Sequence, residues 1–391
     1  MNMKRRYAEI AGWGMYVPSR VVPNDTFVTM GLDTTDEWIS SRTGIERRHM
    51  VGPNEATSDM AVRAAQNALA VAGLQSGDID LIIVATCTPD HVMPATASIV
   101  QNRLGALHAG AMDMNAACSG FVYALSTGAA HIESGRAKNV VVIGADELSI
   151  YLDWKDRSTC VLFGDGAGAV VLRQADEPGI MGSTMGSDGS GADLLTIPGG
   201  GSRIRSNANG ARANGGRNGG HANGASGNYL RMNGPQIFRW ATQIMPRAAE
   251  QVMAASGLKP ENISLLIPHQ ANSRIMESTA RRLGLSSDKV FSNVREYGNT
   301  SAASIPIALC EAIKSDRVHV GDYVVLSSFG AGLSWAALAL RWAVPIPETV
   351  ARWQPIRRQV QSRMAAVRSA LRRGDRAVRT QIDRRLGKNG D

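Results

Sequence analysis

The sequence predicts an α/β fold made of two similar halves, with mostly parallel sheets covered by helices. Buried-strand patterns alternate with helical patterns along most of the 391 residues, which is typical of sheets with helices on their faces. The pattern also repeats, because the strand that begins near Asp78 is matched by one that begins near Asn262, an offset of nearly half the chain. A helix start rich in small residues follows in each half, at 117–120 and at 299–304. A repeat this long indicates a duplicated half rather than a solenoid unit.

The first half shows the elements most clearly. Thr34 or Thr35, followed by Asp and Glu, is typical of a helix N-cap and first turn. The apolar run at 79–86 is typical of a buried parallel strand. The other elements that we expect are a strand at 8–18, helices at 57–76, 96–104 and from Cys118 to about Glu133, and strands at 110–114, 138–144 and within 163–172.

A low-complexity segment at 199–227 separates the two halves. It contains ten glycines, five asparagines and four arginines but no acidic residue, a composition that does not favour a packed structure. We interpret it as a tolerated surface insertion; the alternative is that its arginines guide an acidic partner. The chain is therefore divided into an N-terminal half (1–180), a connecting segment (181–230), a C-terminal half (231–345) and a tail (346–391).

The tail contains the whole net charge of +8. Residues 346–391 include twelve Lys or Arg and four Asp or Glu, which gives 12 − 4 = +8. Apolar residues at near-helical spacing among the arginines make it a candidate basic amphipathic helix. It is interpreted as a solvated extension, with weak contact to an anionic membrane surface or to an acidic protein as the alternatives. No nucleic-acid-binding motif accompanies it, so nucleic acid is not expected as a partner.

The cysteines and the N-terminus indicate the compartment. The four cysteines, Cys87, Cys118, Cys160 and Cys310, show no metal-ligand spacing, a pattern that suits a reducing cytoplasm and predicts no metal site. The basic N-terminal residues are not followed by an apolar segment of a signal peptide. No stretch approaches the roughly 20 apolar residues of a membrane span. We therefore expect a cytoplasmic protein.

Cys118 is the first candidate for catalysis. It stands among small residues, between the expected strand at 110–114 and the helix that follows. At a helix N-terminus the macrodipole and the free N–H groups favour the thiolate, which is the form that attacks an acyl carbonyl. The alternative is a small buried hydrophobe, the usual role of a free cysteine.

Trp38 and Arg42 form a second candidate site. Their i, i+4 spacing places an aromatic ring and a guanidinium on one helix face. Such a face can stack a purine and bind phosphate, but it can equally be a surface cation–π pair.

Six separated sequence motifs resemble those of a known family. They are DEWISSRTGIERR (36–48), NAACSGF (115–121), FGDGAGA (163–169), PHQAN (268–272), GNTSAAS (298–304) and FGAGLSW (329–335). Over about 7–342 the chain resembles the β-ketoacyl-carrier-protein synthase III family, the condensing enzymes that start type II fatty-acid synthesis. The resemblance implies a thiolase-like αβαβα fold, an obligate homodimer, acyl-CoA as starter, malonyl-acyl carrier protein as extender, and no cofactor.

The resemblance also implies a catalytic triad of Cys118, His269 and Asn299. Cys118 would take the acyl group, with its own N–H and the backbone at Ala331 as the oxyanion hole. Loss of CO2 from malonyl leaves an enolate on the thioester oxygen. Because decarboxylation generates the carbanion, no strong base is needed, and His269 Nε2 and Asn299 Nδ2 would stabilise that oxygen as hydrogen-bond donors.

Other roles follow only from the resemblance. Trp38 would stack the adenine of CoA, and Arg42 and Arg157 would contact its phosphates or base. Met93 would limit the acyl pocket of the partner subunit, so the starter chain stays open. Asn272 is expected to orient His269. The carrier protein would dock on Gln270, Ala271, Asn272, Ser273, Arg274 and Arg281.

Related activities are distinguished by single residues. Thiolases use a second cysteine in the C-terminal glycine loop, and 329–332 contains none. Elongating synthases use two histidines, but here Asn299 takes the second position. Two alternatives remain at this stage: a polyketide or secondary-metabolite starter synthase, and a non-catalytic scaffold of the same fold.

Overall fold

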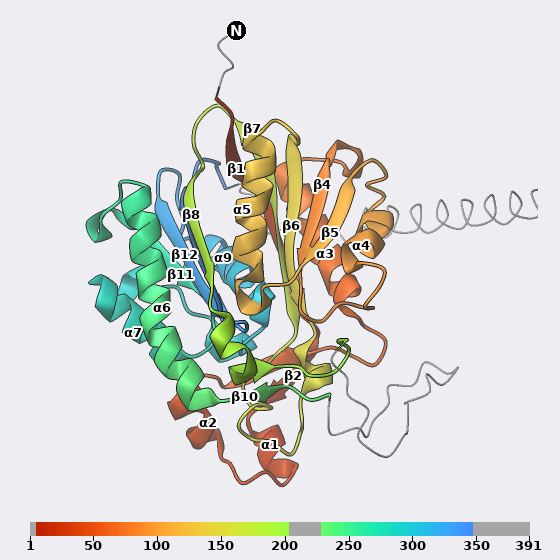
Figure 1. Cartoon of the computed structure of the whole chain (residues 1–391), viewed down its shortest axis with the longest axis vertical. Coiled ribbons are helices and arrows are strands. Elements are labelled where there is room, and N and C mark those ends of the chain that lie inside the picture. The colour runs from red at the N-terminus through yellow and green to blue at the C-terminus, as the bar shows by residue number, and fades with distance from the viewer. Residues whose placement is uncertain (1–4, 203–227, 347–391) are drawn as a thin grey trace, which may run out of the picture.

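The computed structural model describes residues 5–202 and 228–346 (Figure 1). The interpretations of the tail lie outside the described residues, as do those of the insertion from residue 203 onward.

The first half forms a five-stranded sheet in the order β1-β7-β6-β4-β5. Strands β6, β4 and β5 are parallel, whereas β1 and β7 are antiparallel additions at the other edge. The bounds are β1 (Tyr7–Tyr16), β4 (Leu81–Ala85), β5 (Gly110–Met114), β6 (Asn139–Asp146) and β7 (Gly166–Ala175).

Both faces of this sheet are covered, because successive side chains of a strand point to opposite faces. Ile82 and Val84 of β4 pack with α3 (Thr57–Ala72) and α4 (Thr96–Leu104). Ile83 and Ala85 pack on the other side with α5 (Gly120–Glu133). The continuous apolar run therefore corresponds to a strand buried on both faces.

The second sheet has the order β11-β12-β13-β8. The pair β11/β12 is parallel and the other two pairs are antiparallel. Its outer face packs against α6 (Gly234–Ala255) and α7 (Ser273–Leu283), and its inner face against α5 and α9 (Ser304–Lys314). The bounds of the strands are β8 (Ile180–Ser187), β11 (Leu265–Pro268), β12 (Tyr323–Gly330) and β13 (Ser334–Arg341).

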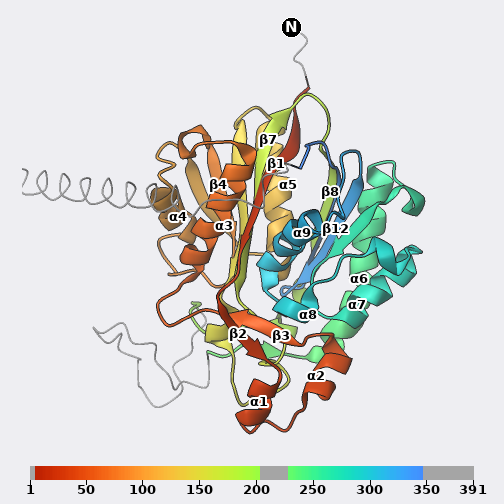
Figure 2. The same ribbon diagram turned by 180° about the vertical axis from the view of Figure 1, so that it is seen from behind.

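Helices α5 and α9 therefore lie between the two sheets, which gives five layers (Figures 1 and 2). The predicted thiolase-like αβαβα architecture is confirmed. The repeat is regular, because the starts of β4 and β11, of α5 and α9, and of β6 and β12 are all separated by the same distance along the chain. Strand β8, which lies at the start of the segment expected to connect the halves, joins the second sheet.

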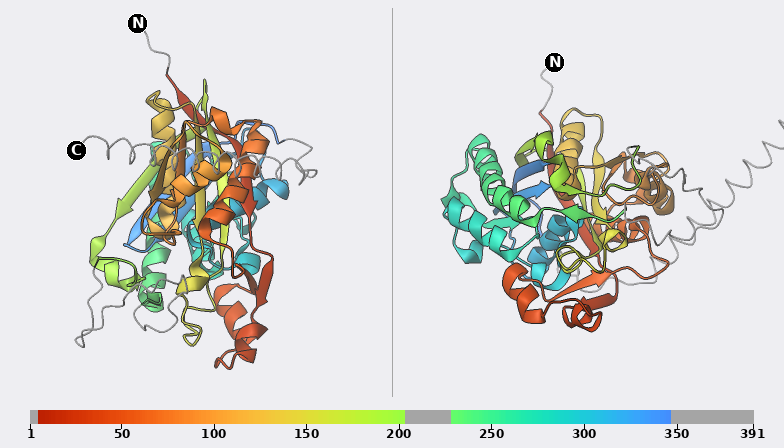
Figure 3. Two further views of the ribbon diagram at one scale, coloured as in Figure 1. Left: turned by 90° about the vertical axis from the view of Figure 1, so that its right-hand side faces the viewer. Right: turned by 60° about the horizontal axis from the view of Figure 1, so that its bottom comes forward.

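The remaining elements gather at one end of the sheets, where the red helices α1 and α2 lie (Figure 3, right). Thr35 is the N-cap of α2, with its side chain accepting from the Trp38 N–H, so the N-cap prediction is confirmed at Thr35. The bounds are β2 (Arg20–Pro23), α1 (Asp25–Thr29), α2 (Asp36–Thr43), β3 (Arg47–Met50), β9 (Leu195–Thr196), β10 (Arg231–Met232) and α8 (Val294–Tyr297).

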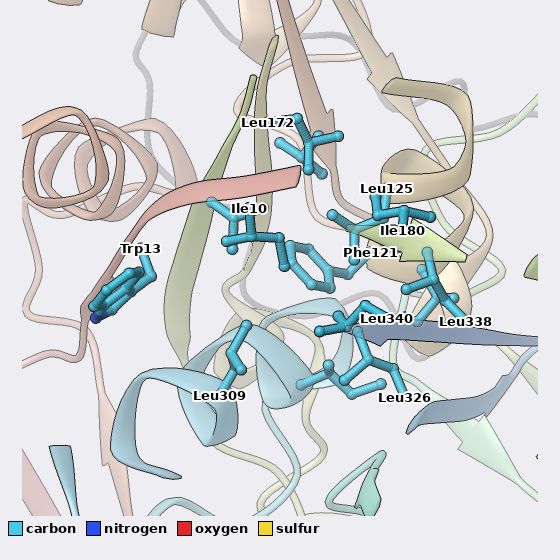
Figure 4. Close-up of a cluster of buried hydrophobic side chains, with 14 of the residues drawn as sticks. Ile10, Trp13, Phe121, Leu125, Leu172, Ile180, Leu309, Leu326, Leu338 and Leu340 are labelled. Atoms are coloured by element: carbon cyan, nitrogen blue, oxygen red, sulfur yellow. The ribbon is translucent and has the colours of Figure 1, made fainter. Parts of the chain in front are cut away.

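One apolar core joins the halves. Phe121 and Leu125 of α5 and Leu309 of α9 meet residues of both sheets (Figure 4). Trp13 of β1 packs edge-on against Trp342, with 5.2 Å between ring centroids. Because both central helices share this core, their N-terminal starts are held in a fixed relation.

Candidate active site

The two duplicated helix starts meet at the site. Cys118 lies in a 3₁₀ turn (Ala117–Ser119) before α5, and the turn Ser301–Ala303 precedes α9. The Cys118 thiol donates to Ser301 Oγ at 3.5 Å. Strand β6 also lies so close to the turn before α9 that a Cβ on Gly144 would be 2.2 Å from the Ala302 carbonyl oxygen. A glycine is therefore required there to let the halves touch.

His269 follows β11 and is completely buried. Its Nδ1 lies 2.6 Å from Ser304 Oγ, and Phe329 packs edge-to-face on the ring at 5.3 Å between centroids. Within the described residues Nε2 has no hydrogen-bond partner. Burial lowers the pKa of His269 to about 3, so the ring is neutral and one nitrogen is an unused polar group.

Asn272 does not orient His269, which corrects the expectation from the sequence. Its Oδ1 caps α7 by accepting from the Arg274 N–H, and its Nδ2 donates to the Arg42 carbonyl at 3.0 Å. The hydroxyl of Ser304 takes the position at the ring instead, since it belongs to the helix start that faces β11.

The side-chain amide of Asn299 is hydrogen-bonded through its oxygen. Its Oδ1 accepts from the Ser301 N–H at 2.9 Å, which directs Nδ2 away from the turn. Nδ2 makes no hydrogen bond to any described residue. His269 Nε2 and Asn299 Nδ2 are therefore two side-chain nitrogens of the second half that have no hydrogen-bond partner among the described residues.

A pocket of about 570 Å³ opens onto Cys118 and Ser301. The backbone at Ala331 and Gly332 forms part of its wall. A Cβ on Gly330 would lie only 2.8 Å from the Cys118 backbone nitrogen, so this segment lies directly against the turn that contains Cys118. The remaining wall is mainly apolar and includes Leu148, Tyr151, Phe163, Leu195 and Leu230, which suits a hydrocarbon chain.

The expected thiolate is wrong for the free protein. Burial raises the pKa of Cys118 to about 12, and the hydrogen bond to Ser301 offsets only part of that effect. The helix start was expected to lower the pKa, but burial of the sulfur away from water destabilises the thiolate more than the helix start stabilises it. Cys118 is therefore a thiol in the free protein.

Alkylation of Cys118 should show this directly. Below its pKa the thiolate fraction rises about tenfold per pH unit, so we expect the rate of reaction with iodoacetamide to rise from pH 6 to pH 9 without a plateau. Peptide mass analysis would separate Cys118 from the other three cysteines. A plateau near neutral pH would contradict the raised pKa.

Comparison with known proteins identifies the family. The family model of 3-oxoacyl-[acyl-carrier-protein] synthase III matches residues 112–189, and the family model of the C-terminal part of the same enzyme matches residues 253–342. The β-ketoacyl-[acyl-carrier-protein] synthase III of Roseiflexus castenholzii is 47% identical over 338 residues, covering 86% of this chain and 98% of the relative. That of Neisseria meningitidis is 47% identical over 339 residues, covering 86% and 100%. The chain belongs to the β-ketoacyl-[acyl-carrier-protein] synthase III family.

Solved structures of synthase III agree with this assignment. The protein from Aquifex aeolicus VF5 aligns with a TM-score of 0.76 at 44% identity, covering 85% of this chain and 99% of that one. A priming β-ketosynthase of the R1128 polyketide pathway aligns with a TM-score of 0.78 at 36% identity, covering 88% and 98%. Because the relatives named synthase III are more similar, at 44% to 47% identity against 36% for the polyketide enzyme, the polyketide alternative is not favoured. The chain is a condensing enzyme of the acyltransferase class.

Trp38 is flanked by both arginines that the synthase III resemblance indicated. The Arg42 guanidinium lies 4.7 Å from the ring centroid and that of Arg157 lies 4.9 Å from it. Arg157 is also paired with the Asp33 carboxylate at 3.0 Å. The ring packs against the apolar cluster that contains Leu148, Phe163 and Leu230, which also line the pocket. The Trp38 ring and the pocket therefore contact the same apolar cluster, although the pocket lining does not include Trp38 or the two arginines.

The expected carrier-docking residues separate into exposed and buried ones. Gln270 is 1% exposed and its amide donates to the carbonyls of Pro268 and Phe291, so it lies below any docking surface. Ala271, Asn272 and Ser273 are half-buried, whereas Arg274 and Arg281 of α7 are exposed.

Met93 lies away from the chain's own pocket. Its side chain and that of Val92 are each 86% exposed, and Val92, but not Met93, belongs to the pocket lining. In the part of the chain that the structure describes, no cluster of His, Cys, Asp and Glu could hold a metal ion, and no helix could cross a membrane.

Three residues of the site were not predicted. Ser301 and Ser304 contact Cys118 and His269, and their only sequence signal is the small-residue helix start. Asp146 is fully buried and accepts from the backbone N–H groups of Cys87 and Ala302, which ties the two halves together. The sequence signal that could have indicated Asp146 is a single acidic residue at the end of an apolar strand.

Proposed function

We propose that the chain transfers an acyl group from acyl-CoA to Cys118 and condenses it with malonyl-acyl carrier protein to give 3-oxoacyl-carrier protein and CO2. The observation that supports this most is a pair of nitrogens without hydrogen-bond partners among the described residues, His269 Nε2 and Asn299 Nδ2, on side chains held by the same helix start that contacts the Cys118 thiol. Two donors without a base suit an enolate formed by decarboxylation. The assignment places the reaction at the initiation of type II fatty-acid synthesis.

In the first half-reaction the Cys118 sulfur bonds to the thioester carbonyl and CoA leaves as its thiol. The proton from Cys118 is available to the leaving sulfur, so the exchange is neutral overall. The oxyanion is stabilised by the Cys118 N–H and the backbone at Ala331, because both lie at the end of the pocket that holds the sulfur.

In the second half-reaction the bond between the malonyl carboxylate and its methylene carbon breaks, and CO2 departs. The electron pair forms an enolate whose oxygen accepts hydrogen bonds from His269 and Asn299. The enolate carbon bonds to the acyl carbonyl, and the Cys118 thiolate leaves. Because His269 stays neutral at working pH, it acts as a donor and not as a charged acid.

A coupled assay tests the whole proposal. The full chain, a panel of acyl-CoAs and malonyl-acyl carrier protein should give 3-oxoacyl-carrier protein and one CO2 for each CoA released. The preferred starter would follow from the rates across the panel. Absence of any C–C bond formation, with every starter, would contradict the proposed function.

We propose that Trp38 stacks the adenine of CoA while Arg42 and Arg157 bind its phosphates. Trp38→Ala should raise the KM for acyl-CoA by about 10- to 100-fold, since base stacking contributes ~1–3 kcal/mol, and should leave kcat nearly unchanged. Arg42→Ala should act in the same direction. Arg63→Ala is the matched control. The Arg63 guanidinium lies 4.5 Å from the centroid of the Tyr16 ring, and neither residue lines the pocket. Equal KM values for the Trp38 and Arg63 variants would exclude this CoA site.

We also propose that Arg274 and Arg281 dock the acidic carrier protein, since both are exposed on α7 beside the site. A cytoplasmic location fits four cysteines that are all free thiols.

The homodimer remains a proposal supported by two features. Strand β5 is the last strand of its sheet, so one edge is unpaired within the described chain. Val92 and Met93 form an exposed apolar tip. Light scattering should give twice the chain mass of 41.6 kDa, and Met93→Asp should lower it. A mass of one chain for the unaltered protein would contradict the dimer.

A further inference from the structure

One turn carries two hydroxyls that contact two different reacting groups. Ser301 and Ser304 stand three residues apart at the start of α9, and both are almost completely buried. Ser301 Oγ lies 3.5 Å from Cys118 Sγ, and Ser304 Oγ lies 2.6 Å from His269 Nδ1. At i, i+3 spacing both side chains lie on one face of the turn, but they meet residues from different halves.

The Ser304 contact decides where the His269 proton sits. The neutral imidazole carries one proton, and the hydrogen bond at one nitrogen determines which nitrogen holds it. The Gln270 N–H points to Ser304 Oγ at 3.5 Å and occupies an acceptor position there. The oxygen keeps a second acceptor position, but Nδ1 is the acceptor that the Ser304 hydroxyl proton faces among the described residues, and donation to Nδ1 leaves the ring proton on Nε2.

The consequence concerns the enolate. Nε2 is the ring nitrogen without a partner among the described residues. With its proton it is a donor ready for a developing oxyanion; without it, the same nitrogen would present a lone pair to negative charge. The Ser304 hydroxyl therefore favours the donor form before any substrate arrives.

The Ser301 contact acts on the sulfur. In the resting thiol, Cys118 donates to Ser301 Oγ. When the thiol loses its proton, the same hydroxyl can reverse and donate to the thiolate, where it stabilises the charge. Its backbone N–H is already held by Asn299 Oδ1, so the serine cannot move away without disturbing the turn.

We propose that these two hydroxyls serve separate half-reactions: Ser301 supports acylation of Cys118, and Ser304 is a positioning residue that sets the Nε2–H form of His269 for decarboxylation. This inference rests on the proposed function. It adds that one turn of the second half controls both steps, through two side chains that do not substitute for each other.

Single-turnover measurements on Ser301→Ala and Ser304→Ala test this, and each variant is the matched control of the other. Acylation is followed by intact mass with acyl-CoA, and decarboxylation by CO2 release from malonyl-acyl carrier protein added to enzyme already acylated. Ser304→Ala should slow CO2 release by about 10- to 100-fold, the size of effect seen when a metal-bound histidine loses its supporting hydrogen bond, and leave acylation within about twofold. Ser301→Ala should slow acylation by a similar factor and leave CO2 release less affected.

A spectroscopic measurement covers the case in which a variant does not fold. Ring ¹⁵N spectra of His269 in the unaltered protein should show a protonated Nε2 and an unprotonated Nδ1. A protonated Nδ1, or equal slowing of both half-reactions by both folded variants, would overturn the inference. If the unaltered protein never acylates Cys118, the proposed function itself fails, which is a different result from either of these.

Discussion

Replacing Cys118 with alanine is expected to abolish acyl transfer. Intact-protein mass after incubation with acyl-CoA should show a gain of one acyl group in the unaltered chain and none in Cys118→Ala. Condensation should fall by about 10⁴-fold or more, as loss of a covalent nucleophile does in other enzymes. The reason is geometric, because Cys118 lines the pocket beneath the segment that contains Ala331.

Cys87→Ala is the demanding control for this experiment. Cys87 lines the same pocket, and its sulfur lies 3.8 Å from Ser301 Oγ, the hydroxyl that also contacts Cys118. Burial raises the pKa of both thiols, so the difference lies in their place in the fold: Cys118 stands at the start of α5, whereas Cys87 follows β4. We expect the adduct to persist in Cys87→Ala. An adduct that survives in Cys118→Ala and disappears in Cys87→Ala would reverse the assignment.

The repeat and its two helix starts could be predicted because they depend on local pattern. The offset between the halves came from strands and small-residue helix starts that are similar in both. A later confirmation is that Ala117 and Ser301, which occupy equivalent positions in the repeat, are both in the left-handed region, with φ of 47° and 51°. Small residues at these positions were a visible sign of a tight turn.

The rest of the site depends on contacts between distant segments, which no local pattern contains. Arg157 reaches the Trp38 ring from a distant part of the sequence, and only the family resemblance suggested it. Gln270 was expected on the carrier-docking surface only because of the family resemblance, yet its amide satisfies buried backbone groups. The Cys118 thiolate was predicted from the helix start alone, whereas burial by both halves decides its pKa.

Replacing His269 with alanine should separate the two half-reactions. Acylation of Cys118 should persist, because the contact to its sulfur within the described site comes from Ser301. CO2 release from malonyl-acyl carrier protein should fall by about 10²- to 10³-fold, the usual cost of removing one oxyanion donor. His319→Ala is the matched control, since that exposed histidine lies outside the site, beside Asp316 and Asp322, and both steps should be unchanged.

The pH dependence gives an independent check on the role of His269. Its pKa is lowered to about 3 by burial, so its protonation does not change between pH 5 and pH 9. The rate of CO2 release from acylated enzyme should therefore show no inflection near the ordinary histidine pKa of about 6.5. If His269 acted as a charged acid, the rate would instead decline as the pH rises through its pKa. An inflection near pH 6.5 that disappears in His269→Ala would mean that the ring titrates in the working enzyme, and that the neutral donor is the wrong description of the second half-reaction.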